Sequence, residues 1–211
     1  MRFIVIDIEA TSTNPHTADM LSFAAFSIVQ KDNGQFDFNT LTAINKYFMY
    51  DKQVPADASA VNGLTRERLM RLSNGDYIDD AIDSMKSFIY APDAILAGYN
   101  VRGYDYNVLS NNLNRYGLEL PKYNGIYDVM YEQKRLLENT MYATRTKIKL
   151  TEAVRTILCD KYGMTMSAIQ NLYTEIIDEL HLRTTMEDNM LFHTALWDSF
   201  VTLLLLIRCR S

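Results

Sequence analysis

The first hydrophobic stretch of the chain predicts a central β-strand. Residues 2–9 are mostly apolar and β-branched, and the run ends where two carboxylates begin. Apolar runs without regular alternation are typical of strands that are buried on both faces of a sheet. Two further strands are predicted over residues 20–30 and 40–50, with turn-forming residues 31–34 between them. The chain is therefore expected to open with three consecutive strands.

Helical patterns dominate the remainder. A loop is predicted over residues 54–63 and one more short strand over 94–98. The predicted helices occupy residues 65–72, 77–90, 105–117, 128–138, 149–162, 166–181 and 194–208. In the stretch 166–181, apolar side chains recur every three or four residues with acids opposite, a pattern that core packing explains best. Together these elements predict a mixed sheet with helices packed against it.

Length and composition indicate a single globular domain over residues 1–211. Hydrophobic residues make up 48% of the chain and charged residues 22%, which excludes collagen-like and disordered classes. The apolar run 200–207 is far shorter than the roughly 20 residues that a bilayer requires, and Asp7 interrupts the first run before a signal-peptide core can form. Cys159 and Cys209 lack the spacing of a zinc ligand pair and cannot form a disulfide framework. We expect a cytoplasmic protein with no membrane partner.

The charge of the chain is unevenly distributed. The net charge is −5, so any contact with nucleic acid must be local. Residues 134–155 nevertheless carry six basic side chains against two acids, Glu138 and Glu152. This segment is the best candidate for a surface that faces phosphates, and the alternative is a solvated helix face followed by a polar loop.

Two acids at the end of the first predicted strand are the first candidate for chemistry. Asp7 and Glu9 are two residues apart, so in a strand their side chains point to the same face. Carboxylates held side by side repel each other unless one takes up a proton or a cation bridges them, and hard oxygen ligands favour Mg²⁺ or Mn²⁺. The alternative is a strand that simply ends in a polar turn.

Two further acids and a histidine lie later in the chain. Asp105 precedes a predicted helix and, taken alone, is interpreted as its N-cap. His193 and Asp198 are five residues apart, which on one continuous helix would place them about 140° apart around the axis. If Thr194 is the N-cap, His193 lies in the preceding loop and can turn toward a site that Asp198 reaches from the first turns of the helix.

These segments resemble a known family. The strand 4–11, the turn 98–105 and the segment 193–198 are similar, in order and spacing, to the three motifs of the DEDDh group of DnaQ-like 3′-to-5′ exonucleases. Weaker similarity covers residues 54–65 and Asp128, so the resemblance spans about residues 2–208. It implies an RNase H-like α/β fold, a mixed five-stranded sheet flanked by helices, here with an added helical segment near 164–190.

The resemblance also implies a mechanism. Two divalent cations, Mg²⁺ or Mn²⁺, would be held by Asp7, Glu9, Asp105 and Asp198, and His193 would act as the general base. Such cations, about 3.5 to 4 Å apart, clamp a scissile phosphate between an attacking water and the leaving oxygen. Without them four carboxylates would repel a polyanion. The implied reaction releases nucleoside 5′-monophosphates from the 3′ end of single-stranded DNA.

The residues expected to hold the terminal nucleotide follow from the same resemblance. They are Ala10, Thr11, Asn62, Leu64, Asn100 and Tyr104. Three positions depart from the family pattern, because Tyr99 and Tyr104 stand where His and Phe are frequent and Asn62 stands where His is frequent. These departures affect how a nucleotide is held and leave the expected metal ligands intact.

Alternatives remain open. An exoribonuclease or oligoribonuclease would use the same residues, and a single-strand binding module without activity would keep the fold. A haloacid-dehalogenase-like phosphatase is disfavoured, because the acidic residues 75–80 precede the fourth predicted strand. The partner is expected to be a single-stranded nucleic acid with a free 3′ end. Monomer and homodimer both stay open, and a polymerase partner is not indicated, because the sequence ends directly after the last predicted helix.

Overall fold

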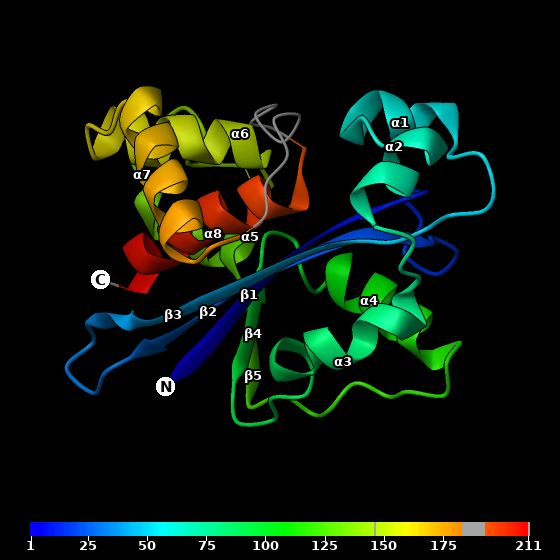
Figure 1. Ribbon diagram of the computed structural model, residues 1–211. Coiled ribbons are helices and arrows are strands. Elements are labelled where there is room, and N and C mark those ends of the chain that lie inside the picture. The colour runs from blue at the N-terminus through cyan, green and yellow to red at the C-terminus, as the bar shows by residue number, and fades with distance from the viewer. Residues whose placement is uncertain (146, 183–192, 211) are drawn as a thin grey trace.

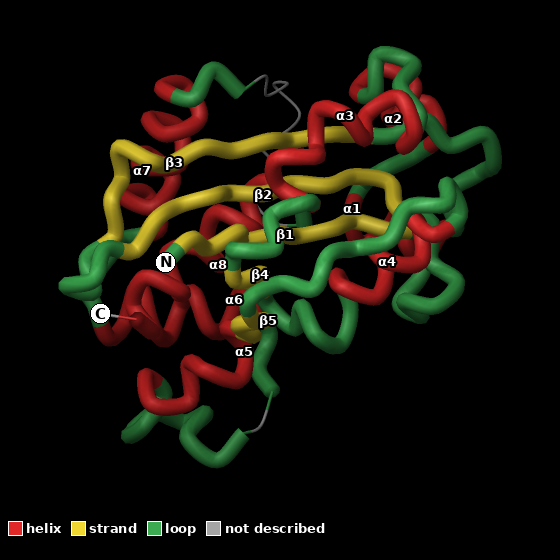
Figure 2. The backbone as a smooth tube through the Cα atoms, turned by 90° about the horizontal axis from the view of Figure 1, so that it is seen from below, coloured by secondary structure: helices red, strands yellow, loops and turns green. Residues whose placement is uncertain are grey.

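A five-stranded mixed sheet organises the molecule. The computed structural model describes residues 1–145, 147–182 and 193–210, and the strands follow one another in the order β3-β2-β1-β4-β5 (Figures 1 and 2). The strands are β1 (Arg2–Ala10), β2 (Met20–Gln30), β3 (Phe36–Tyr47), β4 (Ile95–Gly98) and β5 (Gly125–Asp128). The first three pair antiparallel, whereas β4 runs parallel to both β1 and β5. The predicted mixed α/β sheet is confirmed.

Helices cover both faces of this sheet (Figure 1). In chain order the helical elements are α1 (Ala56–Asn62), α2 (Arg66–Leu72), α3 (Ile78–Ile89), α4 (Asp105–Asn114), α5 (Val129–Glu132), the 3₁₀ helix η1 (Gln133–Leu136), α6 (Leu150–Ala153), the π-helix η2 (Val154–Lys161), α7 (Met166–Glu179) and α8 (Ala195–Arg210). Helices α3 and α4 pack on one face, and α7 and α8 pack on the other. None of the helices in the described ranges is long and apolar enough to cross a membrane.

The alternation of side chains along β1 assigns each residue to one of two cores. Phe3 and Val5 belong to the core beneath α8, whereas Ile4, Ile6 and Ile8 belong to the core beneath α3 and α4. All five side chains are buried. Asp7 and Glu9 continue the odd-numbered series, so they emerge on the face that α8 covers.

Several predicted elements need correction. The loop predicted over 54–63 is wrong, because α1 forms there and ends at Gly63, whose φ of 67° lies in the left-handed region that favours glycine. The predicted helices 128–138 and 149–162 each change helix type, to a 3₁₀ turn in η1 and to a π-helix in η2. The third strand begins four residues earlier than predicted, at Phe36.

The added segment near 164–190 contributes to the core. Helix α7 buries Ile169, Tyr173 and Ile177 in the same core as Trp197 and Phe200 of α8. The Tyr173 ring contacts both α8 rings, with centroid distances of 5.1 and 5.3 Å. Core packing, the interpretation favoured from the sequence, is therefore confirmed for α7, whereas residues 183–190 of the expected segment lie outside the described residues.

This packing makes α7 necessary for stability. Ile169→Ala is expected to lower the free energy of unfolding by about 2–5 kcal/mol, because it leaves a cavity between α7 and α8. Asn171→Ala, on the exposed side of the same helix, should change it by less than about 1 kcal/mol. Denaturant unfolding measures both values, and equal effects would show that α7 does not belong to the cooperative core.

Candidate active site

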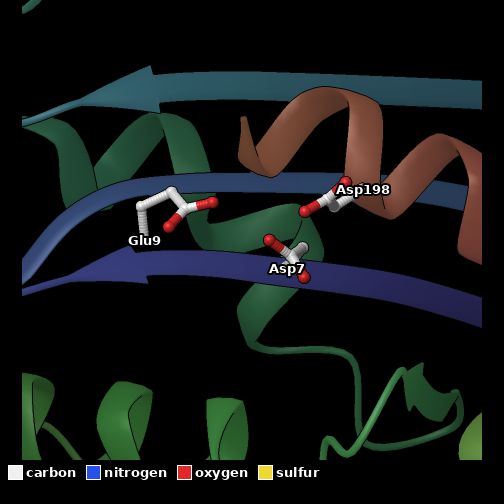
Figure 3. Close-up of side chains that lie close together, drawn as sticks. All are labelled: Asp7, Glu9 and Asp198. Carbon is white, nitrogen blue, oxygen red and sulfur yellow. The ribbon is translucent and has the colours of Figure 1, made fainter. Parts of the chain in front are cut away.

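Three carboxylates converge at the end of the central strand. Asp7 and Glu9 of β1 and Asp198 of α8 each offer an oxygen that lies within 4.8 Å of the other two (Figure 3). All three side chains are partly buried. Residues almost 200 positions apart in the sequence thus share one small volume at the tip of β1.

The start of α8 places Asp198 in this cluster. The Thr194 hydroxyl accepts a hydrogen bond from the Trp197 backbone N–H at 3.4 Å, and the Asp198 N–H donates to the Thr194 carbonyl at 2.9 Å. Thr194 therefore caps the helix, as the sequence predicts. His193 precedes it with a φ of 66° and an exposed side chain, and its backbone N–H donates to the Asp198 carboxylate. The interpretation that His193 lies in the preceding loop is confirmed.

Asp105 lies beside β1 and not at the cap of its own helix. The interpretation of Asp105 as an N-cap is wrong, because Tyr104 occupies the cap position and Asp105 is the first residue of α4. Its Oδ1 accepts the backbone N–H of Ile8 at 3.0 Å. The pairing of β4 with β1 ends at Val5 opposite Ala97, so Asp105 supplies an acceptor where no strand continues.

The turn that leads into Asp105 is held by another buried acid. The Asp128 carboxylate accepts the backbone N–H groups of Asn100, Arg102 and Met130 at 3.0–3.2 Å. Asn100 has a φ of 62°, which an asparagine tolerates better than most residues. Asp128 thereby fixes the path of the chain from β4 into α4.

Burial and mutual repulsion raise the pKa values of the clustered acids. For Asp7, burial contributes most, followed by repulsion from Asp105, Asp198 and Glu9, and its pKa lies well above the usual range. The pKa of Glu9 is raised in the same way, against the effect of a hydrogen bond from the Asn62 side chain. Burial also raises the pKa values of Asp105 and Asp198 to about 7. The cluster therefore favours protons or cations over four free negative charges.

A cavity of about 240 Å³ adjoins Glu9. Its lining includes Ala10, Asn62 and Tyr104, three of the residues expected to hold a nucleotide. The other three have different neighbours in the structure. The Thr11 hydroxyl accepts the Asp19 N–H, Leu64 packs in a small core with Leu21, Val54 and Leu69, and the Asn100 N–H donates to Asp128.

Sequence reasoning missed several residues of this cavity. Ser12, Thr13, Asp57, Ala58 and Val61 also line it. Val61 leaves 60% of its surface exposed on α1, directly before Asn62. The signal for this cavity in the sequence is an aliphatic side chain on the polar side of a short helix. It can be recognised only when α1 is already known to be a helix.

The donor set fits divalent metal ions. The cluster consists of carboxylate oxygens, which are the hard ligands that Mg²⁺ and Mn²⁺ prefer. The three grouped acids can share a cation, and Asp105 adds a fourth negative charge that acts on Asp7. Bound cations would relieve the repulsion that raises these pKa values.

The fold and the site together define the class of protein. A sheet in the order 3-2-1-4-5, with acids from β1, α4 and α8 gathered at one end of the central strand, has the RNase H-like fold. The family model RNase T, described as an exonuclease, matches residues 4–206, so the chain belongs to this family. The resemblance found in the sequence is confirmed.

The solved structures that are similar to this chain include exonucleases. The zinc-bound complex of E. coli exonuclease I with single-stranded DNA has a TM-score of 0.67 and 16% sequence identity, over 98% of this chain and 39% of that chain. The complex of the same enzyme with a dA16 oligonucleotide has a TM-score of 0.66 and 16% identity, over 100% and 41% of the two chains.

A third structure, exonuclease I from Methylocaldum szegediense, has a TM-score of 0.58 and 18% identity, over 100% of this chain and 41% of that chain. The chain thus spans about two fifths of the length of these structures. The comparison with curated proteins gives no match.

The raised pKa values lead to a test of pH dependence. Folded carboxyls keep their protons up to about pH 7, whereas unfolded ones release them near pH 4, so the metal-free protein should lose stability as the pH rises between these values. Asp7→Asn removes one negative charge from the cluster. Between pH 5 and pH 8 the free energy of unfolding should fall in this variant by at least about 1 kcal/mol less than in the wild type.

Urea unfolding in EDTA measures this difference, and Asp178→Asn on exposed α7 surface is the matched control. Mn²⁺ should then stabilise the wild type more than Asp7→Asn. Parallel pH profiles for all three proteins would show that the carboxylates do not repel one another.

Proposed function

We propose that this domain is a 3′-to-5′ exonuclease that hydrolyses single-stranded DNA and releases nucleoside 5′-monophosphates with two divalent cations. The observation that carries the proposal is the convergence of Asp7, Glu9 and Asp198 within 4.8 Å, in a chain that belongs to an exonuclease family. Bound Mg²⁺ or Mn²⁺ would activate the attacking water and stabilise the charge that develops on the leaving oxygen.

The residues of the chain divide the remaining work. Asp7, Glu9 and Asp198 would hold the cations. Asp105 is the fourth acid of the set, and it also accepts the hydrogen bond from the Ile8 N–H. His193 accepts the proton of the attacking water, the general-base role that histidine fills most often in enzymes. Its backbone N–H donates to the Asp198 carboxylate, so its exposed side chain starts from a position beside the cluster.

The cavity beside Glu9 is proposed to receive the 3′-terminal nucleotide. It lies between β1, α1 and α4, and Asn62 connects its wall to the acids through the hydrogen bond to Glu9. The Asn62 Oδ1 accepts the Leu64 N–H at 3.0 Å, which fixes the orientation of the amide. Thr11 supports the cavity wall, because its hydroxyl accepts a hydrogen bond that fixes the loop that begins with Ser12. Leu64 and Asn100 support residues of the lining, since the Leu64 N–H donates to Asn62 and the Asn100 carbonyl accepts the Tyr104 N–H at 3.0 Å.

Similarity to solved structures supports DNA as the substrate. The two E. coli exonuclease I structures described above contain single-stranded DNA or a dA16 oligonucleotide. A binding module without activity is the less economical explanation, because all four acids and His193 are present and the acids lie together.

The role of His193 can be separated from metal binding. His193→Ala should lower kcat by about 10²–10⁴-fold, the range that general-base catalysis contributes, and should leave Mn²⁺ affinity nearly unchanged. Single-turnover hydrolysis and titration calorimetry provide the two values. His181→Ala, which changes another exposed histidine, is the control. Equal losses of turnover and of Mn²⁺ affinity would make His193 a ligand instead of a base.

Substrate preference is decided by matched oligonucleotides. We expect 5′-labelled DNA of 2, 5 and 12 nucleotides to be shortened stepwise from the 3′ end in Mn²⁺, with kcat/KM at least about 10-fold higher than for RNA of the same sequence. This ratio corresponds to about 1.4 kcal/mol of discrimination. Faster digestion of RNA, or of dinucleotides alone, would reassign the domain to exoribonucleases or oligoribonucleases.

A further inference from the structure

A short exposed segment between η1 and α6 carries positive charge. We call residues 141–145 and 147–149 the basic strap. Arg145, Lys147 and Lys149 are all exposed, whereas Ile148 between the two lysines leaves only 6% of its surface accessible. Ile148 packs into the core beneath α8, so the lysines on either side of it point outward.

A hydrogen-bond chain fixes the strap beside the catalytic end of the sheet. The Tyr99 hydroxyl donates to the Ile148 carbonyl at 2.8 Å and accepts from the Gln133 side chain at 2.9 Å. Tyr99 directly follows β4, and the pairing of β4 with β1 ends with Ala97 opposite Val5, two residues before Asp7. The hydrogen bond from Tyr99 therefore anchors the strap at the end of β4, which is also the end of the sheet that carries the acids.

The lysines of the strap form no ion pair with the acids in the part of the chain that the structure describes. Among the described residues, no ion pair involves Lys147 or Lys149, whereas Arg145 has Glu152 at 4.0 Å. That pair is exposed and therefore weak. The second oxygen of Glu152 accepts the backbone N–H of Lys149 at 2.9 Å, which secures the strap without touching the lysine ammonium group.

An aromatic ring adds a stacking surface. The Arg145 guanidinium lies over the Tyr142 ring, 5.2 Å from its centroid. Tyr142 packs partly against the core, so the arginine forms a flat, exposed cationic layer above a supported ring. Positive charge interleaved with stacked planar groups is the combination that binds single strands without sequence preference.

We propose that the basic strap binds the phosphates of the substrate strand on the 5′ side of the scissile bond. The inference rests on the proposed function, since it takes the strand to end at the acids. The cavity for the terminal nucleotide lies beside α1, and α6, which follows the strap, stands on the other side of the start of α8 (Figure 1). A strand that leaves the cavity across the acids therefore reaches the lysines, which offset the repulsion from a chain of net charge −5.

The test compares single charge removals on and off the strap. Lys147→Gln, Lys149→Gln and their double variant are measured beside Lys122→Gln, an exposed lysine that precedes β5 at the opposite end of the sheet. Anisotropy of a labelled dT12 is measured in Ca²⁺, a hard cation that carboxylates bind, and a gel of the same samples checks that the strand stays intact. We expect the double variant to bind at least about 5-fold more weakly and to reduce the slope of log K against log salt concentration by about 1.4, the value for two phosphate contacts.

Kinetics separate the strap from the catalytic centre. In Mn²⁺, KM for dT12 should rise in the double variant, whereas kcat and the KM for a dinucleotide should stay the same. Lys147→Arg/Lys149→Arg should restore binding of dT12, which excludes loss of folding as the cause.

The proposal is overturned if the double variant binds dT12 with the affinity and salt slope of Lys122→Gln, or if KM rises equally for the dinucleotide. If the double variant binds dT12 more weakly but the wild type has no nuclease activity, the basic strap is a DNA-binding surface and the proposed function is rejected.

Discussion

The repulsion between carboxylates at the tip of β1 is the constraint on which the rest of the structure depends. Folding brings Asp7, Glu9, Asp105 and Asp198 together, and burial makes their charges costly. The fold tolerates this arrangement because two large cores on either side of the sheet hold the elements in place. Repulsion between the carboxylates destabilises such a site while no cation is bound. Cation binding removes this repulsion, and the relief adds to the affinity for the cations.

Each acid reaches the site by a different physical device. Alternation along β1 points Asp7 and Glu9 toward α8, and the Thr194 cap sets the first turn that carries Asp198. Asp105 takes the place of a missing strand neighbour by accepting the Ile8 N–H. The same end of the sheet also carries the cavity beside Glu9 and the anchor of the basic strap, so the contacts proposed for the substrate surround one cluster of acids.

The sequence predicted those features that depend on local pattern. The bounds of β2 agree with residues 20–30, and the pairing of Asp7 with Glu9 follows from the two-residue repeat of a strand. Features that depend on contacts between residues far apart in the sequence could not be predicted from it. The acceptor role of Asp105 toward Ile8 spans 97 residues, and the anchoring of Ile148 by Tyr99 spans 49. Helix α1 was missed because seven residues after a proline carry too few turns for a periodic signal.

The most direct measurement of the central claim is the position of Mn²⁺ in a crystal of this protein, located by its anomalous scattering. The account predicts density between the carboxylates of Asp7, Glu9 and Asp198, with metal–oxygen distances near the roughly 2.1 Å of hard divalent ions. Density at another site, or an empty cluster at saturating Mn²⁺, would contradict it.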